Sequence, residues 1–192
     1  MKPEEVINEF KKTDALLEGH FQLTSGLHSP VYLQCARVLQ YPDKAERFGQ
    51  AIARQFENQE IALVASPAIG GIVIGHEVAR ALGARFVWTE RESGKMTLRR
   101  GFSITPGEKT LVVEDVITTG GSTRETIETL KAAGADVIGA ASIIDRSNGE
   151  ADVSVSRIAL ASLKVTSVDP SACDACKLGD TAVKPGSRAV SS

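Results

Sequence analysis

The chain is poor in the residues that bind metals or form disulfides. Its 192 residues include only three cysteines and three histidines. Two of the cysteines, Cys173 and Cys176, form a Cys-x-x-Cys pair, which supplies half of the ligands that a structural zinc site usually needs, and no histidine lies near it in the sequence. The strand and helix that flank a thioredoxin-type redox pair are also missing there. We therefore expect reduced thiols in a tight turn, with zinc bound between subunits as the alternative.

The chain also lacks a long apolar run and an excess of charge of either sign. No stretch approaches the roughly 18 apolar residues of a membrane span, and the polar, amphipathic start (MKPEEVINEFKK) is unlike a signal peptide. A net charge of −2 gives no reason to expect nucleic acid or an anionic membrane as the principal partner. We expect a cytoplasmic protein in which recognition of anions is confined to a local site.

What is present is the composition of a globular domain, 42% hydrophobic and 24% charged, in a chain long enough for a sizeable core. Residues 20–34 alternate around a Ser-Gly turn, as in a β-hairpin. Hydrophobic spacing predicts helices over residues 3–12, 43–57, 72–82 and 123–133, and strands over residues 61–65, 85–88, 110–114, 137–144 and 158–163.

Strands that alternate with helices indicate an α/β fold with a mostly parallel central sheet flanked by helices. Ligands of such sheets bind at the carboxyl ends of the strands. We expect a single domain over residues 1–192, with a core at about 43–150 and a small hood formed by about 1–42 and 151–192.

The most informative segment is residues 111–123, LVVEDVITTGGST. An apolar run ends in Glu114 and Asp115, and a loop of hydroxyl and glycine residues then opens a helix. The first N–H groups of a helix lack internal partners and carry partial positive charge, so this loop can surround a phosphate with donors. The two carboxylates suit ribose hydroxyls or a hydrated metal. We expect a sugar-phosphate site; in the alternative the carboxylates only lead into the helix, and Thr119 or Ser122 caps it.

Two further polar segments follow predicted strands. SPAIGG at residues 66–71 holds an anion with backbone N–H groups, or is only a tight turn. Residues 89–102 carry Arg91, Lys95, Arg99 and Arg100 with two glycines, which is typical of a mobile lid that closes over anions. Because Glu90 and Glu92 offset two of these cations, a solvated hairpin of mixed charge is the alternative.

Residues 111–123 resemble the PRPP-binding signature of the type I phosphoribosyltransferases, and three other motifs are similar to those of the orotate enzymes in this family. FQLTSGLHSPVYLQ resembles their N-terminal motif, and Asp145-Arg146 resembles their base-binding pair. CDACKLGDTAVKPGSR resembles the C-terminal tail of a subset of bacterial and archaeal members. The resemblance implies the type I phosphoribosyltransferase fold. It also implies transfer of the phosphoribosyl group of PRPP to orotate, which gives orotidine 5′-monophosphate and pyrophosphate in pyrimidine biosynthesis.

The resemblance also implies which residues form the site. The catalytic residues would be Lys95, Asp115 and Arg91. The remaining PRPP-binding residues would be Glu114, Val116, Ile117, Thr118, Thr119, Gly120, Gly121, Ser122, Thr123, Ala68, Ile69, Gly70 and Gly71, with an unusual backbone geometry at Ala68 and Ile69. Orotate would contact Thr118, Arg146, Tyr32, Ser25 and Gly26. Mg²⁺ would bind mainly through PRPP and water, and the loop at about 90–101 would reach the partner's site in a homodimer.

Four positions depart from the family pattern. Gly70, Glu92 and Thr24 stand where many orotate enzymes have lysine, and Thr97 stands in place of a histidine. Taken alone, an arginine such as Arg146 is more often a partner in a surface ion pair. A phosphoribosyltransferase for a purine or for uracil is the nearer alternative function, and a PRPP sensor that binds nucleic acid is the more distant one, against which the net charge counts.

Overall fold

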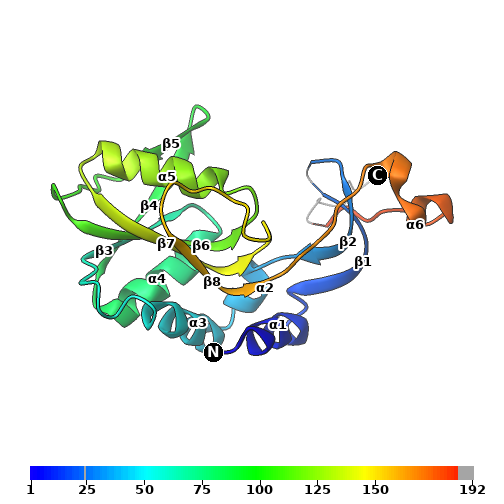
Figure 1. The fold of residues 1–192 in the computed structure, drawn as a ribbon, viewed down its shortest axis with the longest axis horizontal. Coiled ribbons are helices and arrows are strands. Elements are labelled where there is room, and N and C mark those ends of the chain that lie inside the picture. The colour runs from blue at the N-terminus through cyan, green and yellow to red at the C-terminus, as the bar shows by residue number, and fades with distance from the viewer. Residues whose placement is uncertain (24, 186–192) are drawn as a thin grey trace.

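The structure, a computed structural model, describes residues 1–23 and 25–185. Thr24 and the end of the C-terminal tail motif, residues 186–188, lie outside the described residues. A six-stranded sheet forms the centre of the molecule, with strand order β5-β4-β3-β6-β7-β8 (Figure 1). Its strands are β3 (Leu63–Pro67), β4 (Arg85–Glu92), β5 (Lys95–Leu98), β6 (Lys109–Ile117), β7 (Asp136–Asp145) and β8 (Arg157–Ser162). All neighbours pair in parallel except β4 and β5, which confirms the expected α/β fold.

Helices cover both faces of this sheet. On one face, α3 (Pro42–Ala53) and α4 (Gly71–Leu82) pack against Val64, Leu111 and Val113, together with α1 (Pro3–Lys12). On the other face, α5 (Gly121–Ala132) packs against Leu63 and Val112. Successive residues of β3 and β6 therefore point to opposite cores. Because both faces are covered, these strands are continuous apolar runs rather than alternating ones.

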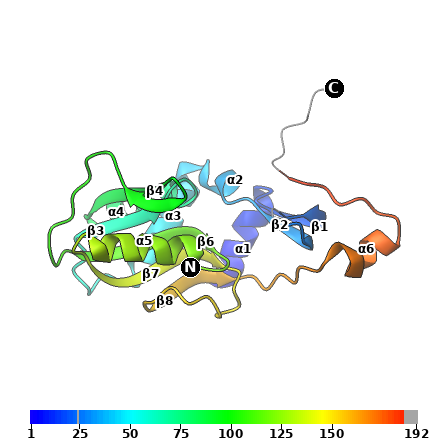
Figure 2. The ribbon, with the colours of Figure 1, turned by 90° about the horizontal axis from the view of Figure 1, so that it is seen from above.

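The hood consists of a hairpin and the C-terminal segment. The hairpin pairs β1 (Leu16–Gln22) with β2 (His28–Leu33), and a short helix, α2 (Ala36–Leu39), connects it to the core. After β8 the chain leaves the sheet and runs past the hairpin to a 3₁₀ turn, η1 (Pro170–Ala172), and a short helix, α6 (Asp174–Lys177) (Figure 2). Isolated bridges join His28 to Val168 and Phe21 to Val183, so this segment adds to both edges of the hairpin.

The core is larger than the sequence indicated. Strand β8 belongs to the central sheet, so the core continues to Ser162 rather than ending near residue 150. Helix α1, assigned to the hood, buries Val6 and Phe10 in the main core cluster. Among the described residues, no helix is long and apolar enough to cross a membrane.

Candidate active site

Three polar segments meet at the carboxyl ends of neighbouring strands. Residues 68–71 follow β3, residues 118–123 follow β6, and residues 146–149 follow β7. Because β3, β6 and β7 are parallel neighbours, their ends lie at one edge of the sheet. This is the edge at which open α/β sheets bind ligands.

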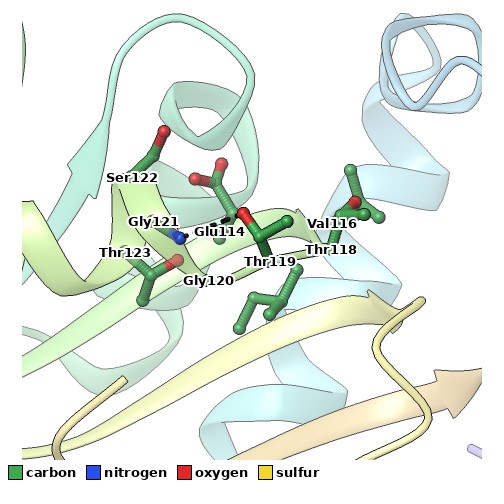
Figure 3. A pocket seen from close by; sticks show the side chains of 9 residues that line it. Glu114, Val116, Thr118, Thr119, Gly120, Gly121, Ser122 and Thr123 are labelled. Carbon is green, nitrogen blue, oxygen red and sulfur yellow. Dashed lines mark hydrogen bonds between the residues drawn. The ribbon is translucent and has the colours of Figure 1, made fainter. Parts of the chain in front are cut away.

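A cavity of about 160 Å³ lies between the end of β6 and the start of α5. It is lined by Glu114, Val116, Ile117, Thr118, Thr119, Gly120, Gly121, Ser122 and Thr123, and Figure 3 shows these side chains around the first turn of the helix. Gly120 caps α5 with a left-handed φ of 77°, and a Cβ there would lie 2.8 Å from Val153 Cγ1, so the position requires glycine. The backbone N–H groups at this helix start and the hydroxyls around them form a site suited to a phosphate group.

The two carboxylates at the end of β6 have no cationic partner among the described residues. Glu114 is only 8% exposed, and its Oε1 accepts a hydrogen bond of 3.2 Å from the backbone N–H of Asp115. Burial, and then the neighbouring Asp115, raise the pKa of Glu114 well above its usual range. Such a pair is free to accept hydrogen bonds from sugar hydroxyls or to bind the water shell of a cation.

The loop after β3 lies directly against these carboxylates. The Ala68–Ile69 peptide is cis, so the unusual backbone geometry implied by the resemblance is present. A Cβ at Gly70 would lie 2.9 Å from both carboxylate oxygens of Asp115. Glycine at position 70 therefore lets the Asp115 carboxylate approach the loop closely.

Arg146 is half-buried, and the described part of the chain supplies no carboxylate to it. Its Nε is buried without a hydrogen-bond partner, and burial lowers the pKa of the guanidinium. The adjacent carboxylate, Asp145, instead accepts hydrogen bonds from Arg157 (3.0 Å), from the backbone N–H (2.7 Å) and hydroxyl (2.6 Å) of Ser147, and from the N–H of Gly149 (3.1 Å). The alternative in which Arg146 forms an ordinary surface ion pair therefore does not hold.

Residues at the junction of hood and core form a second cavity, which sequence reasoning missed. The cavity has a volume of about 370 Å³ and is lined by Gln34, Ala36, Leu39, Gln40, Ile69, Gly70, Val73 and Asp115. Cys35 lies beside it, 2% exposed, and burial followed by the nearby Asp115 raises the pKa of its thiol well above the usual range. The position of residues 34–40 directly after the hairpin motif was the only signal that could have found them.

The cationic segment is a hairpin rather than a loop without regular structure. Strands β4 and β5 pair around Ser93 and Gly94, both of which have a positive φ. Arg91 forms an ion pair of 2.8 Å with Glu125 of α5, and Lys95 is exposed. Within one chain, no described hydrogen bond or ion pair joins Arg91 or Lys95 to residues 114–123. The hairpin of mixed charge is thus the conformation present, and delivery of these cations to the site is not seen.

The predicted base-binding residues of the hood make their described contacts within the hairpin. Tyr32 packs against Phe21 with ring centroids 5.8 Å apart, and Ser25 and Gly26 form the hairpin turn. Among the described residues, no hydrogen bond, ion pair or ring contact joins any of the three to Arg146.

Comparison with known proteins gives a consistent result. The sequence model of the phosphoribosyl transferase domain matches residues 37–171. An orotate phosphoribosyltransferase of Desulforamulus reducens is 54% identical over 190 residues, covering 99% of this chain and all of the relative, and one of Pelotomaculum thermopropionicum is 53% identical with the same coverage. The crystal structure of orotate phosphoribosyltransferase from Aeropyrum pernix, 26% identical, superposes with a TM-score of 0.66 over 82% of this chain and 93% of that one. The chain therefore belongs to the phosphoribosyl transferase domain family and, within it, to the orotate phosphoribosyltransferases.

Proposed function

We propose that this protein transfers the phosphoribosyl group of PRPP to orotate and releases pyrophosphate, the step that gives orotidine 5′-monophosphate in pyrimidine biosynthesis. One observation carries the proposal. A phosphate cradle, a carboxylate pair without a cation and a half-buried arginine without a carboxylate meet at one edge of the sheet. In a complex with PRPP and orotate, the cradle would bind the 5′-phosphate, the carboxylate pair would bind the ribose hydroxyls, and the arginine would bind orotate.

PRPP would span the first three segments. Residues 118–123 hold the 5′-phosphate, Glu114 and Asp115 accept hydrogen bonds from the ribose hydroxyls, and residues 68–71 hold the pyrophosphate through backbone N–H groups. In the reaction the C1–O bond breaks, its electron pair leaves with pyrophosphate, and a ring nitrogen of orotate supplies the pair for the new C1–N bond. Asp115 is our candidate for the group that accepts the proton lost from this ring nitrogen. Catalysis then depends on alignment and on stabilising the leaving group.

Arg146 would bind the planar base. A guanidinium offers paired donors in a fork that matches a carboxylate or neighbouring imide oxygens, and these bonds are strongest where water is excluded. The cavity lined by residues 34–40 and 69–73 lies beside Asp115 and provides space for a ring next to the ribose. Thr118 and the hood residues Tyr32, Ser25 and Gly26 remain our proposal for further orotate contacts.

The residues present fit a magnesium ion bound with the substrate. Glu114 and Asp115 are oxygen ligands without a protein cation, which suits a hard ion that keeps much of its water. Mg²⁺ held by PRPP, water and this carboxylate pair would neutralise charge on the leaving pyrophosphate.

We further propose a homodimer in which the β4–β5 hairpin acts in the partner's site. Lys95 is exposed and forms no ion pair among the residues that the structure describes, and Arg91 extends from the same hairpin. Two cations delivered from a second subunit would supply the charge that the pyrophosphate loop itself lacks. They would also exclude water that hydrolyses PRPP.

The test is the fall in orotate absorbance on mixing the enzyme with orotate, PRPP and Mg²⁺. We expect turnover of orotate and none of uracil, adenine or hypoxanthine. Arg146→Gln should lower kcat/KM for orotate by about 10- to 100-fold, because one or two bonds to a charged group, each about 1.5–3 kcal/mol, are weakened. Its Kd for PRPP should stay within about twofold, since this arginine does not contact the phosphate loop.

Arg80→Gln, an exposed arginine on α4, is the matched control and should retain full activity. Turnover of a purine in place of orotate would overturn the proposal. So would an Arg146→Gln variant that loses PRPP binding and keeps its relative preference for orotate.

A further inference from the structure

Four side chains that bind metals meet in the hood, although they come from opposite ends of the chain. They are His20 on β1, His28 on β2, Cys173 before α6 and Cys176 within α6, and one ligand atom from each lies within 4.8 Å of all the others. No histidine lies near the Cys-x-x-Cys pair in the sequence, but two lie beside it in the structure. More than 140 residues separate the two pairs in sequence, as shown by the spacing of 148 between His28 and Cys176.

Three of the four short distances between these atoms fall in the range of a tetrahedral zinc site, and the distance between the two histidine nitrogens is shorter. His20 Nε2 lies 2.9 Å from His28 Nδ1, 3.3 Å from Cys173 Sγ and 3.7 Å from Cys176 Sγ, and Cys176 Sγ lies 3.3 Å from His28 Nδ1. Zinc bonds of about 2.0–2.1 Å to nitrogen and about 2.3 Å to sulfur place tetrahedral ligand atoms about 3.3–3.8 Å apart. A set of two sulfurs and two nitrogens at this spacing is typical of Zn²⁺ rather than of Mg²⁺ or Ca²⁺.

The surrounding residues hold the ligands as an outer shell would. The Asp180 carboxylate lies 3.2 Å from Nδ1 of His20, a buried atom that makes no hydrogen bond among the described residues. A carboxylate at the far nitrogen of a histidine fixes the ring and strengthens its donor atom toward a metal. His28 exchanges backbone hydrogen bonds of 2.8 and 2.9 Å with Val168, and Val183 donates one of 2.8 Å to the carbonyl of His20. Both histidines therefore sit on backbone that the C-terminal segment itself braces.

Apolar packing alone does not explain why these four side chains lie together. Residues 170–177 contain only a 3₁₀ turn of three residues and a helix of four, and no residue of either is assigned to the hydrophobic core clusters. Cys173 is nevertheless 5% exposed and His28 is 7% exposed, so polar ligands are buried where little apolar packing holds them. A metal ion provides the missing attraction between this segment and the hairpin.

We infer that His20, His28, Cys173 and Cys176 bind one Zn²⁺ within a single chain, and that this ion fastens the C-terminal segment to the β1–β2 hairpin. The site is closed by four protein ligands, so its role is structural rather than catalytic. It lies in the hood and not at the sheet edge, so this inference does not depend on the proposed function.

The first test is metal content and coordination in the full-length protein, purified under reducing conditions from cells supplied with zinc. We expect about one zinc per chain by mass spectrometry of the metal. Replacement by Co²⁺ should give thiolate-to-cobalt charge-transfer bands and the intense visible bands of tetrahedral cobalt. Wild-type protein with neither bound zinc nor these bands would overturn the inference, whatever the variants do.

Variants then identify the ligands. Cys173→Ser and His28→Asn should lose the zinc and the tetrahedral cobalt spectrum, while His76→Asn, an exposed histidine on α4, should keep both. Asp180→Asn should keep the spectrum and bind zinc about 10- to 100-fold more weakly. Unchanged zinc and an unchanged spectrum in both ligand variants would contradict the assignment. Circular dichroism checks that each variant is folded. If a variant does not fold, the metal content and cobalt spectrum of the wild type still test the inference.

Discussion

The Asp115 carboxylate occupies the space that a side chain at position 70 would fill. A Cβ at that position would lie 2.9 Å from both carboxylate oxygens of Asp115, so the carboxylate keeps its place only because the glycine has no side chain. We predict that Gly70→Ala displaces this carboxylate and weakens PRPP binding about tenfold, the equivalent of one lost hydrogen bond to a charged group. Isothermal titration with PRPP and Mg²⁺ measures the change.

A double-mutant cycle separates this effect from damage to the loop. In an Asp115→Ala background the added methyl group has no carboxylate to displace, so Gly70→Ala should then have almost no further effect. A full tenfold loss in both backgrounds would show that the alanine acts on the loop itself.

Burial of Glu114 lowers the stability of the folded protein by an amount that depends on pH. Burial, and then Asp115, raise its pKa in the folded state, so between the ordinary pKa of 4.5 and the raised value the folded protein holds a proton that the unfolded chain has released. Stability falls with rising pH wherever the native state binds more protons. We predict that Glu114→Gln becomes more stable relative to the wild type as the pH rises above the ordinary pKa, and that the difference levels off above the raised pKa. Urea unfolding from about pH 5 to 8 tests this, and a difference independent of pH would contradict it.

The positions of single residues were predictable where neighbouring residues in the sequence determine the local geometry. The hydroxyl and glycine residues at 118–123 are contiguous, so the motif by itself predicts that they lie at a helix start. Cys35 and Arg157 were not found, because their partners Asp115 and Asp145 are distant in sequence and no local pattern marks them.

At the scale of elements, β8 organises the loop that carries Arg146. Arg157 on β8 is largely buried and donates hydrogen bonds to Asp145, to the Ser147 hydroxyl and to the carbonyl of Ala151. Burial raises the pKa of Asp145, but hydrogen bonds from Ser147 and Arg157 outweigh it and hold that pKa below the usual range. The carboxylate thus stays ionised and committed to Arg157, which leaves Arg146 free for a ligand.

Arg157→Met should therefore damage both stability and orotate binding. We predict a loss of about 3 kcal/mol in the free energy of unfolding, because removing one partner leaves a buried charge in the other. KM for orotate should rise more than the Kd for PRPP, since the misplaced loop carries Arg146 and not the phosphate cradle. Urea unfolding and steady-state kinetics measure the two effects, with Arg80→Met on the surface of α4 as the control. Equal losses in the two variants would refute this role of β8.

Elements were predictable where period and burial agree, and less so where tertiary contacts decide. The buried strands and amphipathic helices of the core lie within a few residues of the expected ranges. The β4–β5 hairpin was ambiguous because its composition suits either a lid or a pair of strands. Contacts with α5 decide it, through a buried hydrogen bond of 2.8 Å between Thr89 and Thr126 and one of 3.0 Å from Thr129 to the carbonyl of Met96.

At the scale of the whole molecule, we propose a substrate site at the edge of the central sheet and a zinc site in the hood. The sheet edge contains polar groups without protein partners, such as Arg146 Nε, whereas the hood contains four side chains of the kinds that bind metal ions. The Cys-x-x-Cys pair marked only half of the second site in the sequence, because the two histidines come from a hairpin at the other end of the chain that the C-terminal segment bridges. The sequence located the hairpin and the tail separately, but the cluster of side chains that joins them becomes visible only in three dimensions.

No hydrogen bond or ion pair in the described part of the chain joins Lys95 to residues 114–123, and in the homodimer that we propose a second subunit would supply this cation. We predict that Lys95→Ala and Arg146→Ala are each nearly inactive as homodimers, and that a purified heterodimer of the two recovers about half of wild-type activity. In that heterodimer one site combines the intact Arg146 of the first chain with the intact Lys95 of the second, and the other site carries both defects. If the hairpin acted within its own chain, every site would hold one defect and no activity would return. Co-expression with two affinity tags yields the heterodimer, and the orotate absorbance assay decides between the two arrangements.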